Sequence, residues 1–343
     1  MFTSGDDQET PRRRKRSDRS QDELEEGLEE YQKAKSIVAR CPELTVDELR
    51  KLLTDASENK RRAALHCIGE RGPALADEIL PDVVALLRSD DPLTKRYAIG
   101  CLGDFRGRGA PSIPRLRDIL ATEKDPALIR ALLIAIGSIG MEPDCVSLFT
   151  RHLCHAELNI ICLTPVVLYG SGSLFDVALV ATDPGSTYVC RDRAIMVLAM
   201  IAGTSKEVLM QASVDRQAAQ SLMQSNPPAG ILAIALQRKA SDDDVLVIQK
   251  ALSNPSRHVV LAALAAIEVH SLGSKTEAML DGIIMCIDHE DSDIPFLAVR
   301  VLDNLAVKNK RAREALQRAT ELRNSWASAA AKRALTKHGG NSE

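Results

Sequence analysis

Apolar residues recur at intervals of three and four along most of this chain, a spacing typical of amphipathic helices. Between residues 60 and 140 the whole pattern also returns at a fixed distance. An arginine and a glycine mark it at equal intervals: Arg62, Arg96 and Arg130, and Gly69, Gly103 and Gly137. An internal period of about 34 residues predicts an array in which each repeat packs against its neighbours.

Each repeat has the signals of a helix pair. The dipeptides Asp91-Pro92 and Asp125-Pro126 are separated by the same period. Aspartate suits the residue before a helix, because its carboxylate accepts the free N–H groups of the first turn, and proline suits the first helical position. The glycine near the end permits a tight exit turn. A second, more exposed helix follows, at 78–87 in one repeat and 112–120 in the next.

The pattern resembles that of HEAT repeats, in which the loop aspartate, the proline and the following arginine brace one repeat against the next. Asp91, Pro92 and Arg96 match these positions, as do their counterparts one period later. The resemblance implies an all-α solenoid of about seven to eight antiparallel helix pairs. It is clear over 55–140, irregular over 141–240 and fair over 241–335.

The chain divides into four parts. Residues 1–20 are highly charged and poor in apolar residues, so we expect disorder. Residues 21–54 should form N-terminal capping helices, the first of them at 21–39. Residues 55–338 should form the repeat array, and 339–343 a disordered end.

In the irregular part we expect a helix at 160–168 to pair with one at 174–181. A fifth repeat should start near Arg193. Pro165 and the pair Pro227-Pro228 are the expected breaks in this region. Further pairs follow at 231–236 with 245–252, at 259–267 with 279–287, and from Asp293 to the C-terminal helices at 311–323 and 325–335.

Composition supports an array and excludes several classes. Aromatic residues make up only 3% of the chain, whereas a β-sandwich of this size normally has more of them. The N-terminus has no secretory signal, the apolar segments are too short to cross a membrane, and the cysteines show no CxxC pair. We therefore expect a soluble protein without membrane insertion, reduced and cytoplasmic, or nuclear if the cell is eukaryotic.

Charge is segregated along the chain. Residues 131–299 contain 10 Lys and Arg against 18 Asp and Glu, whereas residues 300–343 contain 10 against 4. Such a contrast can steer a charged partner. The candidate partner-binding residues are therefore basic and lie in the N-terminal tail and the C-terminal helices: Arg12, Arg13, Arg14, Lys15, Arg16, Arg311, Arg318, Arg323, Lys332 and Arg333.

A cluster of Cys and His is the only candidate for metal chemistry. It comprises Cys145, His152, Cys154, His155, Glu157 and Cys162. These side chains could hold zinc, but buried cysteine more often behaves as a small apolar residue. Cys67 and Cys101 occupy equivalent core positions in two repeats. We therefore predict no metal, no cofactor and no catalytic residue.

Enzymes built on similar repeats do not fit these residues. The di-iron hydroxylase of deoxyhypusine uses several His-Glu pairs, but this chain has one, His289-Glu290. A HEAT-like alkylpurine DNA glycosylase requires a basic groove with aromatic residues, and the middle of this chain is acidic. Bilin lyases share the repeat, which alone implies no activity.

Three hypotheses follow. The first is a non-catalytic scaffold or adaptor that binds a protein partner. The second is a nucleic-acid-associated solenoid that uses the basic tail and the C-terminal helices. The third is a repeat-fold enzyme or metal-binding protein centred on the Cys and His cluster.

Overall fold

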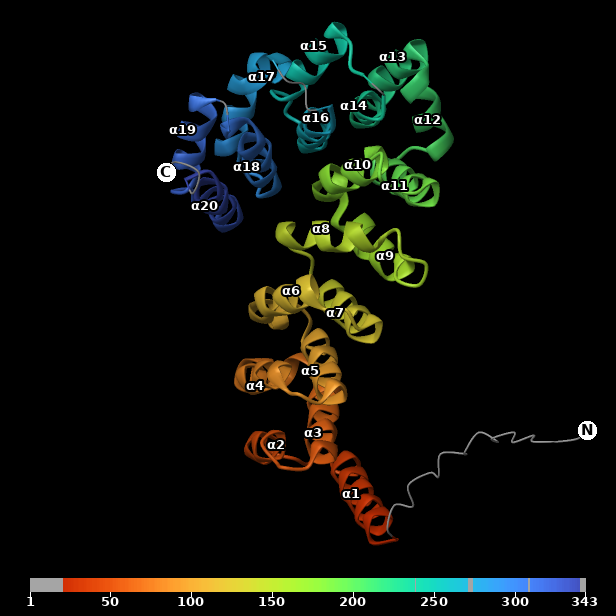
Figure 1. Cartoon of the computed structure of the whole chain (residues 1–343), viewed down its shortest axis with the longest axis vertical. Helices are drawn as coiled ribbons and strands as arrows, with labels where there is room; N and C mark the ends of the chain where they lie inside the picture. The colour runs from red at the N-terminus through yellow and green to blue at the C-terminus, as the bar shows by residue number, and fades with distance from the viewer. Residues whose placement is uncertain (1–20, 238, 271–273, 308, 340–343) are drawn as a thin grey trace, which may run out of the picture. The chain divides into compact units, whose positions relative to one another are not determined.

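The computed structural model describes residues 21–237, 239–270, 274–307 and 309–339. Within these ranges the chain forms α-helices and short 3-10 segments, and no strand occurs among them. The helices pack in neighbouring pairs (Figure 1). The prediction of an all-α solenoid is therefore confirmed. Contacts divide the chain into two units, 1–109 and 110–343, and the boundary falls inside the predicted repeat array.

Unit 1 is regular, with two layers of helices. Its elements are α1 (Gln21–Ala39), α2 (Val46–Leu53), α3 (Glu58–Arg71), α4 (Pro73–Ala85), η1 (Leu86–Arg88) and α5 (Pro92–Asp104). In one layer α3 packs between α1 and α5, and in the other α2 packs against α4 (Figure 1). Each helix therefore contacts only its neighbours in the array, as expected for a repeat protein.

Local signals fix the ends of the helices in unit 1. Thr45 and Glu48 form a reciprocal capping box at the start of α2. Asp91 accepts a hydrogen bond from the backbone N–H of Thr94 and caps α5, whose first residue is Pro92. Gly72 has φ +56°, a backbone conformation that glycine adopts without strain, and it joins α3 to α4. A helix lies at 21–39 as predicted, and the Asp-Pro pair begins α5 as predicted.

Unit 2 contains the remaining helices. They are α6 (Ile113–Thr122), α7 (Pro126–Ile139), α8 (Pro143–His152), α9 (Asn159–Tyr169), η3 (Gly170–Ser173), α10 (Leu174–Thr182), α11 (Tyr188–Ile201), α12 (Lys206–Val214), α13 (Arg216–Ser225), α14 (Pro227–Ala235), α15 (Asp242–Ala251), α16 (Arg257–His270), α17 (Ser274–Met285), η4 (Cys286–Asp288), α18 (Asp293–Ala306), α19 (Lys310–Ala319) and α20 (Ser325–Gly339). A 3-10 segment, η2 (Arg106–Ser112), spans the division between the units.

The array in unit 2 folds back on itself. Helices α7, α9 and α11 pack in sequence, and α14, α16, α18 and α20 form a second series. Between the two series, α12 and α13 pack against each other and against α14. As a result α10 lies directly against α16, which is far from it in sequence (Figure 1).

Polar contacts hold this return in place. Arg300 of α18 donates two hydrogen bonds to the carboxylate of Asp176 on α10, at 2.8 and 2.9 Å. The same guanidinium stacks over Phe175, 4.2 Å from the ring centre. The hydroxyl of Tyr169 donates to Asp293 at 2.7 Å. Because both hydrogen-bonded pairs join residues far apart in sequence, the fold of unit 2 depends on pairing that no local signal indicates.

The irregular part differs from our expectation in three ways. Pro165 does not break the chain, since α9 continues through it. The segments at 160–168 and 174–181 do not form a pair, because α9 packs on α8 while α10 packs on α11. A helix that we did not expect, α13, precedes Pro227, where the chain breaks as predicted and α14 begins. A Cβ at Gly230 of α14 would lie 2.6 Å from the Met223 backbone, so close contact with α13 requires glycine there.

One segment is longer and more apolar than the sequence suggested. Asn159–Thr182, which is α9 followed by α10, has a window of mean hydropathy 1.6 and could cross a membrane by length and composition. The bent pair α11 and α12 passes the same criterion only if it is taken as one span. Half of the first window is buried inside the structure, as in a core helix, and the segment gives no clear sign of membrane insertion.

Candidate binding groove

Helices α1, α3 and α5 of unit 1 form an open groove with a volume of about 750 Å³. Four apolar or aromatic side chains on its walls face solvent, and their exposed fractions are 62% for Tyr31, 48% for Leu93, 45% for Tyr97 and 37% for Val38. Small residues lie between them, including Ala63 and Gly100. Exposed apolar side chains gathered in a concave surface are typical of a binding site.

Arg62 braces α3 against the start of α5 at one end of the groove. Its Nε donates to Asp91 at 3.1 Å, and its Nη2 donates to Glu58 at 2.8 Å. Although burial opposes it, hydrogen bonds from Thr94 and then the Arg62 guanidinium lower the pKa of Asp91. The bracing role implied for Asp91 is therefore observed. Arg96 is exposed, and the described residues include no ion-pair partner for it.

The opposite end of the groove is acidic. Glu70 and Asp104 are the last or next-to-last residues of α3 and α5, and neither has an ion pair among the described residues. Burial, and then the neighbouring charge of Glu70, raise the pKa of Asp104, while Arg106 and His66 oppose the shift. Gly69 allows this close approach, because a Cβ there would lie 2.7 Å from Oδ2 of Asp104.

Unit 2 has a second, more apolar groove on α7 and α9, with a volume of about 540 Å³. Ile134, Ile160 and Leu168 line it and are exposed, Leu168 to 80%. The two helices meet closely at Gly137, where a Cβ would lie 3.0 Å from the ring of Pro165. This groove contains no charged side chain in its lining.

Two of the five predicted basic residues of the C-terminal helices form ion pairs within unit 2. Arg333 donates to Asp144 at 3.1 Å, and Arg117 contacts the same carboxylate at 2.8 Å. Arg311 forms an ion pair with Asp281. For Arg318, Arg323 and Lys332 no ion pair is present among the described residues. Part of the charge contrast along the sequence is therefore neutralised inside the fold.

The other predicted basic residues, Arg12, Arg13, Arg14, Lys15 and Arg16, lie outside the described residues. Their role in binding remains a prediction.

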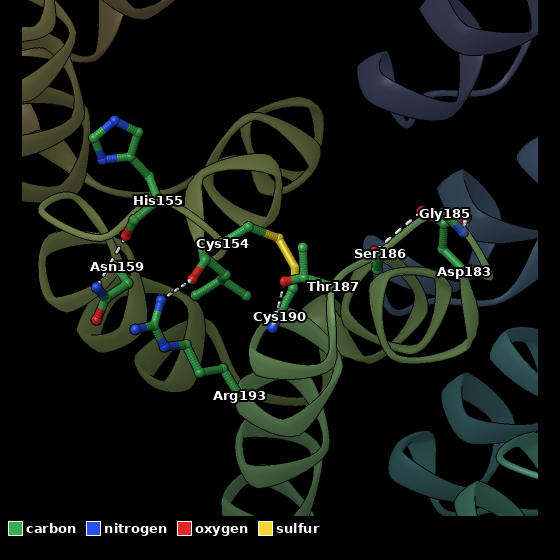
Figure 2. The surroundings of a disulfide bond; sticks show 10 residues. Cys154, His155, Asn159, Asp183, Gly185, Ser186, Thr187, Cys190 and Arg193 are labelled. Atoms are coloured by element: carbon green, nitrogen blue, oxygen red, sulfur yellow. Dashed lines mark hydrogen bonds between the residues drawn. A yellow bond between two sulfur atoms is a disulfide. The ribbon is translucent and has the colours of Figure 1, made fainter.

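The Cys and His cluster does not form a metal site. Cys154 is bonded to Cys190 as a disulfide that ties the end of α8 to α11 (Figure 2). In the same view His155 points away from the sulfur atoms, and its backbone carbonyl accepts a hydrogen bond from Asn159 (Figure 2). Within the described part of the chain no group of three potential metal ligands occurs.

The remaining cysteines behave as core residues. Cys41 is bonded to Cys67, which joins the segment after α1 to α3. Cys101, Cys145, Cys162 and Cys286 are buried and free, and burial raises the pKa of Cys145 to about 12. These disulfides differ from the reduced state that we expected. Their partners are 26 and 36 residues apart, a spacing that carries no signal until the repeats are stacked.

A family model for HEAT repeats matches residues 46–137. This segment consists of HEAT repeats. The match covers α2 to α7, the region where the repeat period is clear, so the family resemblance read from the sequence is confirmed there. No curated protein matches the chain.

Among solved structures, the chain is similar to that of an engineered protein, with 19% identity and a TM-score of 0.38. The alignment covers 94% of this chain and 97% of that one. A likeness this distant assigns no site.

Sequence reasoning did not find the groove between α1, α3 and α5. Arg62 and Arg96 occupy equivalent positions in the repeat, but of the two only Arg62 pairs with an aspartate among the described residues. A signal was present in the repeat itself. Glu70 and Asp104 are also separated by one repeat period, and aspartate or glutamate in the last turn of a helix opposes the helix dipole.

Proposed function

We propose that this chain is a non-catalytic scaffold that binds a protein partner through the groove of unit 1. The observation that carries the proposal is the cluster of exposed Tyr31, Leu93 and Tyr97 in a concave surface formed by α1, α3 and α5. Aromatic side chains contribute large contact areas at protein interfaces and are common among the residues that dominate affinity. The groove of α7 and α9 offers a second apolar surface in unit 2.

The described residues give the other two hypotheses less support. Nucleic-acid binding depends on free Lys and Arg side chains that contact phosphates, and several C-terminal basic residues already pair with carboxylates. The metal hypothesis lacks its ligand set, because Cys154 is bonded to Cys190.

Photo-crosslinking in the native cell tests the proposal. A photoreactive amino acid replaces Tyr97 in the groove, and in a control it replaces Ala85, an exposed residue of α4 outside the groove. We expect a discrete protein adduct from position 97 that position 85 does not give. If neither position gives an adduct, or if both give the same one, the groove is not a specific protein-binding site.

A further inference from the structure

Two neighbouring helices of the groove, α3 and α5, each have an arginine in their first half and an acidic residue at their end. In α3, Arg62 precedes Glu70 by eight residues, and in α5, Arg96 precedes Asp104 by eight. At 1.5 Å per residue, each base and acid are separated by about 12 Å along the helix. The groove therefore has a basic end and an acidic end. The next repeat lacks this pattern, because Ser138 stands where the acid would be.

Helix stability does not explain the acidic end. The C-terminus of a helix carries partial negative charge, so an acid in its last turn is unfavourable by about 0.3–1 kcal/mol. Here Glu70 and Asp104 lie at two adjacent helix ends, and their mutual repulsion adds to this cost. No Lys or Arg among the described residues forms an ion pair with either carboxylate. A cation placed between the two carboxylates would reduce their mutual repulsion and would also offset the unfavourable interaction of each carboxylate with the dipole of its own helix.

The basic end shows the complementary feature. Arg62 has its charge satisfied by Asp91 and Glu58, but Arg96 lines the groove, is exposed and has no carboxylate in reach among the described residues. On α5, Tyr97 lies between Arg96 and Asp104, whereas Leu93 precedes Arg96 at the basic end, and Tyr31 and Lys35 of α1 also line the groove. Along α5 the groove thus presents an exposed arginine with apolar side chains beside it and, about 12 Å further on, two carboxylates without an ion pair among the described residues.

We propose that the groove of α1, α3 and α5 binds an amphipathic helix of a partner protein. The charges along that helix are opposite to those of the groove, with an acidic residue at the basic end and a basic residue at the acidic end. An acidic residue of the partner lies at Arg96, apolar residues pack on Tyr31, Leu93 and Tyr97, and a Lys or Arg about eight residues later lies between Glu70 and Asp104. This inference rests on the proposed protein-binding function and specifies the partner's chemistry.

The charge order also sets the direction of the bound helix. A partner helix that runs parallel to α5 has its acid toward its N-terminus and its base toward its C-terminus. Both positions are favoured by the partner's own helix dipole. The antiparallel direction would require the acid in the last turn and the base in the first, which the dipole disfavours. The parallel direction is therefore the one that the partner's own helix dipole favours.

Selection from a library of helical peptides tests the proposal. The library is displayed on a small helical scaffold, with one helix face randomised, and it is selected against the full chain. We expect the enriched sequences to carry Asp or Glu, then apolar residues at intervals of three and four, then Lys or Arg about eight residues after the acid.

Binding of the selected peptides is then measured for a charge-reversal variant of the groove and for a matched control variant. The double variant Glu70→Lys with Asp104→Lys should weaken binding of the selected peptides about tenfold or more, as measured by fluorescence anisotropy. The control variant Glu78→Lys with Asp90→Lys makes the same change of net charge at exposed residues of α4 and the following turn, and should bind as the wild type does. Circular dichroism of both variants checks that the helices remain folded.

Several outcomes overturn the proposal. They are the absence of any enriched peptide, enriched peptides without the acid-to-base order, and equal loss of binding in the two double variants. If crosslinking at position 97 captures a partner while the selected peptides show no charge order, the scaffold function stands and the partner chemistry proposed here is wrong. If crosslinking fails while charge-ordered peptides bind, the proposed protein-binding function is wrong and only the charge preference of the groove is supported.

Discussion

The two units use charge in different ways. In unit 2, Asp144 and Asp176 are almost fully buried and hold arginines from the C-terminal helices, so opposite charges close the fold. In unit 1, the helices contact only their neighbours, and Arg96, Glu70 and Asp104 stay unpaired at the edges of a groove. A charged side chain that already forms an ion pair within the fold is less available to bind a partner. Among the described residues, unpaired bases also occur in unit 2, at Arg318, Arg323 and Lys332, but the unpaired charges of unit 1 are of both signs and lie beside exposed aromatic side chains in one groove. The search for binding therefore starts at unit 1, whereas the sequence pointed to the basic C-terminal end.

The largest expected effect comes from breaking the closure of unit 2. Arg300→Ala leaves Asp176, whose side chain is 5% exposed, without its partner. Removing one member of a buried ion pair costs about 3–5 kcal/mol. We expect a loss of this order in chemical unfolding followed by fluorescence of Trp326, the single tryptophan of the chain, which lies in unit 2.

Arg216→Ala is the control, because its pair with Asp243 is exposed on both sides. An exposed pair contributes about 0–1 kcal/mol. If Arg300→Ala and Arg216→Ala change stability equally, the long-range ion pair does not hold unit 2 closed.

Each unit contains one disulfide, so the two bonds can be removed one at a time and their effects compared. A bond that closes a loop of this length contributes about 2–4 kcal/mol. Replacing Cys41 and Cys67 by alanine should increase hydrogen exchange in unit 1 alone, and replacing Cys154 and Cys190 should do so in unit 2 alone. Mass spectrometry after alkylation should find four free thiols before reduction and eight after it. Eight alkylated cysteines without reductant would contradict both bonds.

The brace in unit 1 gives a pH-dependent effect. Because the pKa of Asp91 is lowered in the folded state, its contribution to stability is present above the pKa of an unfolded aspartate. That contribution is lost as pH falls through the folded pKa. Arg62→Ala removes a favourable charge from this carboxylate and should cost about 1 kcal/mol at neutral pH.

Thermal unfolding of the Arg62→Ala variant across acidic pH measures this. We expect the difference between variant and wild type to shrink as Asp91 becomes protonated. A difference that stays constant through this range would show that the arginine acts by packing and not through its charge.

The smallest effect should be common to both units. Thr45 caps α2 in unit 1 and Ser241 caps α15 in unit 2, each in a capping box. Thr45→Ala and Ser241→Ala should each cost about 1 kcal/mol. Similar losses in the two units would show that local helix signals act alike in both, so that the units differ through long-range contacts. A loss several times larger in one unit would contradict this.

Sequence reasoning succeeded where structure is local. The period set by Arg62 and Arg96, the cap at Asp91 and the helix at 21–39 all follow from signals within one repeat. It failed where α10 meets α16, because the Asp176–Arg300 pair joins residues far apart in the chain. Charge composition indicated that the C-terminal end is basic, but it could not indicate that Arg333 is paired with Asp144. The groove needed the stacking of three helices before Glu70 and Asp104 came together.

The most direct test of the central claim combines the native partner with the groove charges. Crosslinking from position 97 is repeated in the cell with Glu70→Lys and Asp104→Lys, and with the control changes Glu78→Lys and Asp90→Lys. We predict that the partner adduct is lost in the first background and kept in the second. An adduct of equal yield in both backgrounds would contradict the claim that the unpaired charges of unit 1 recognise the partner.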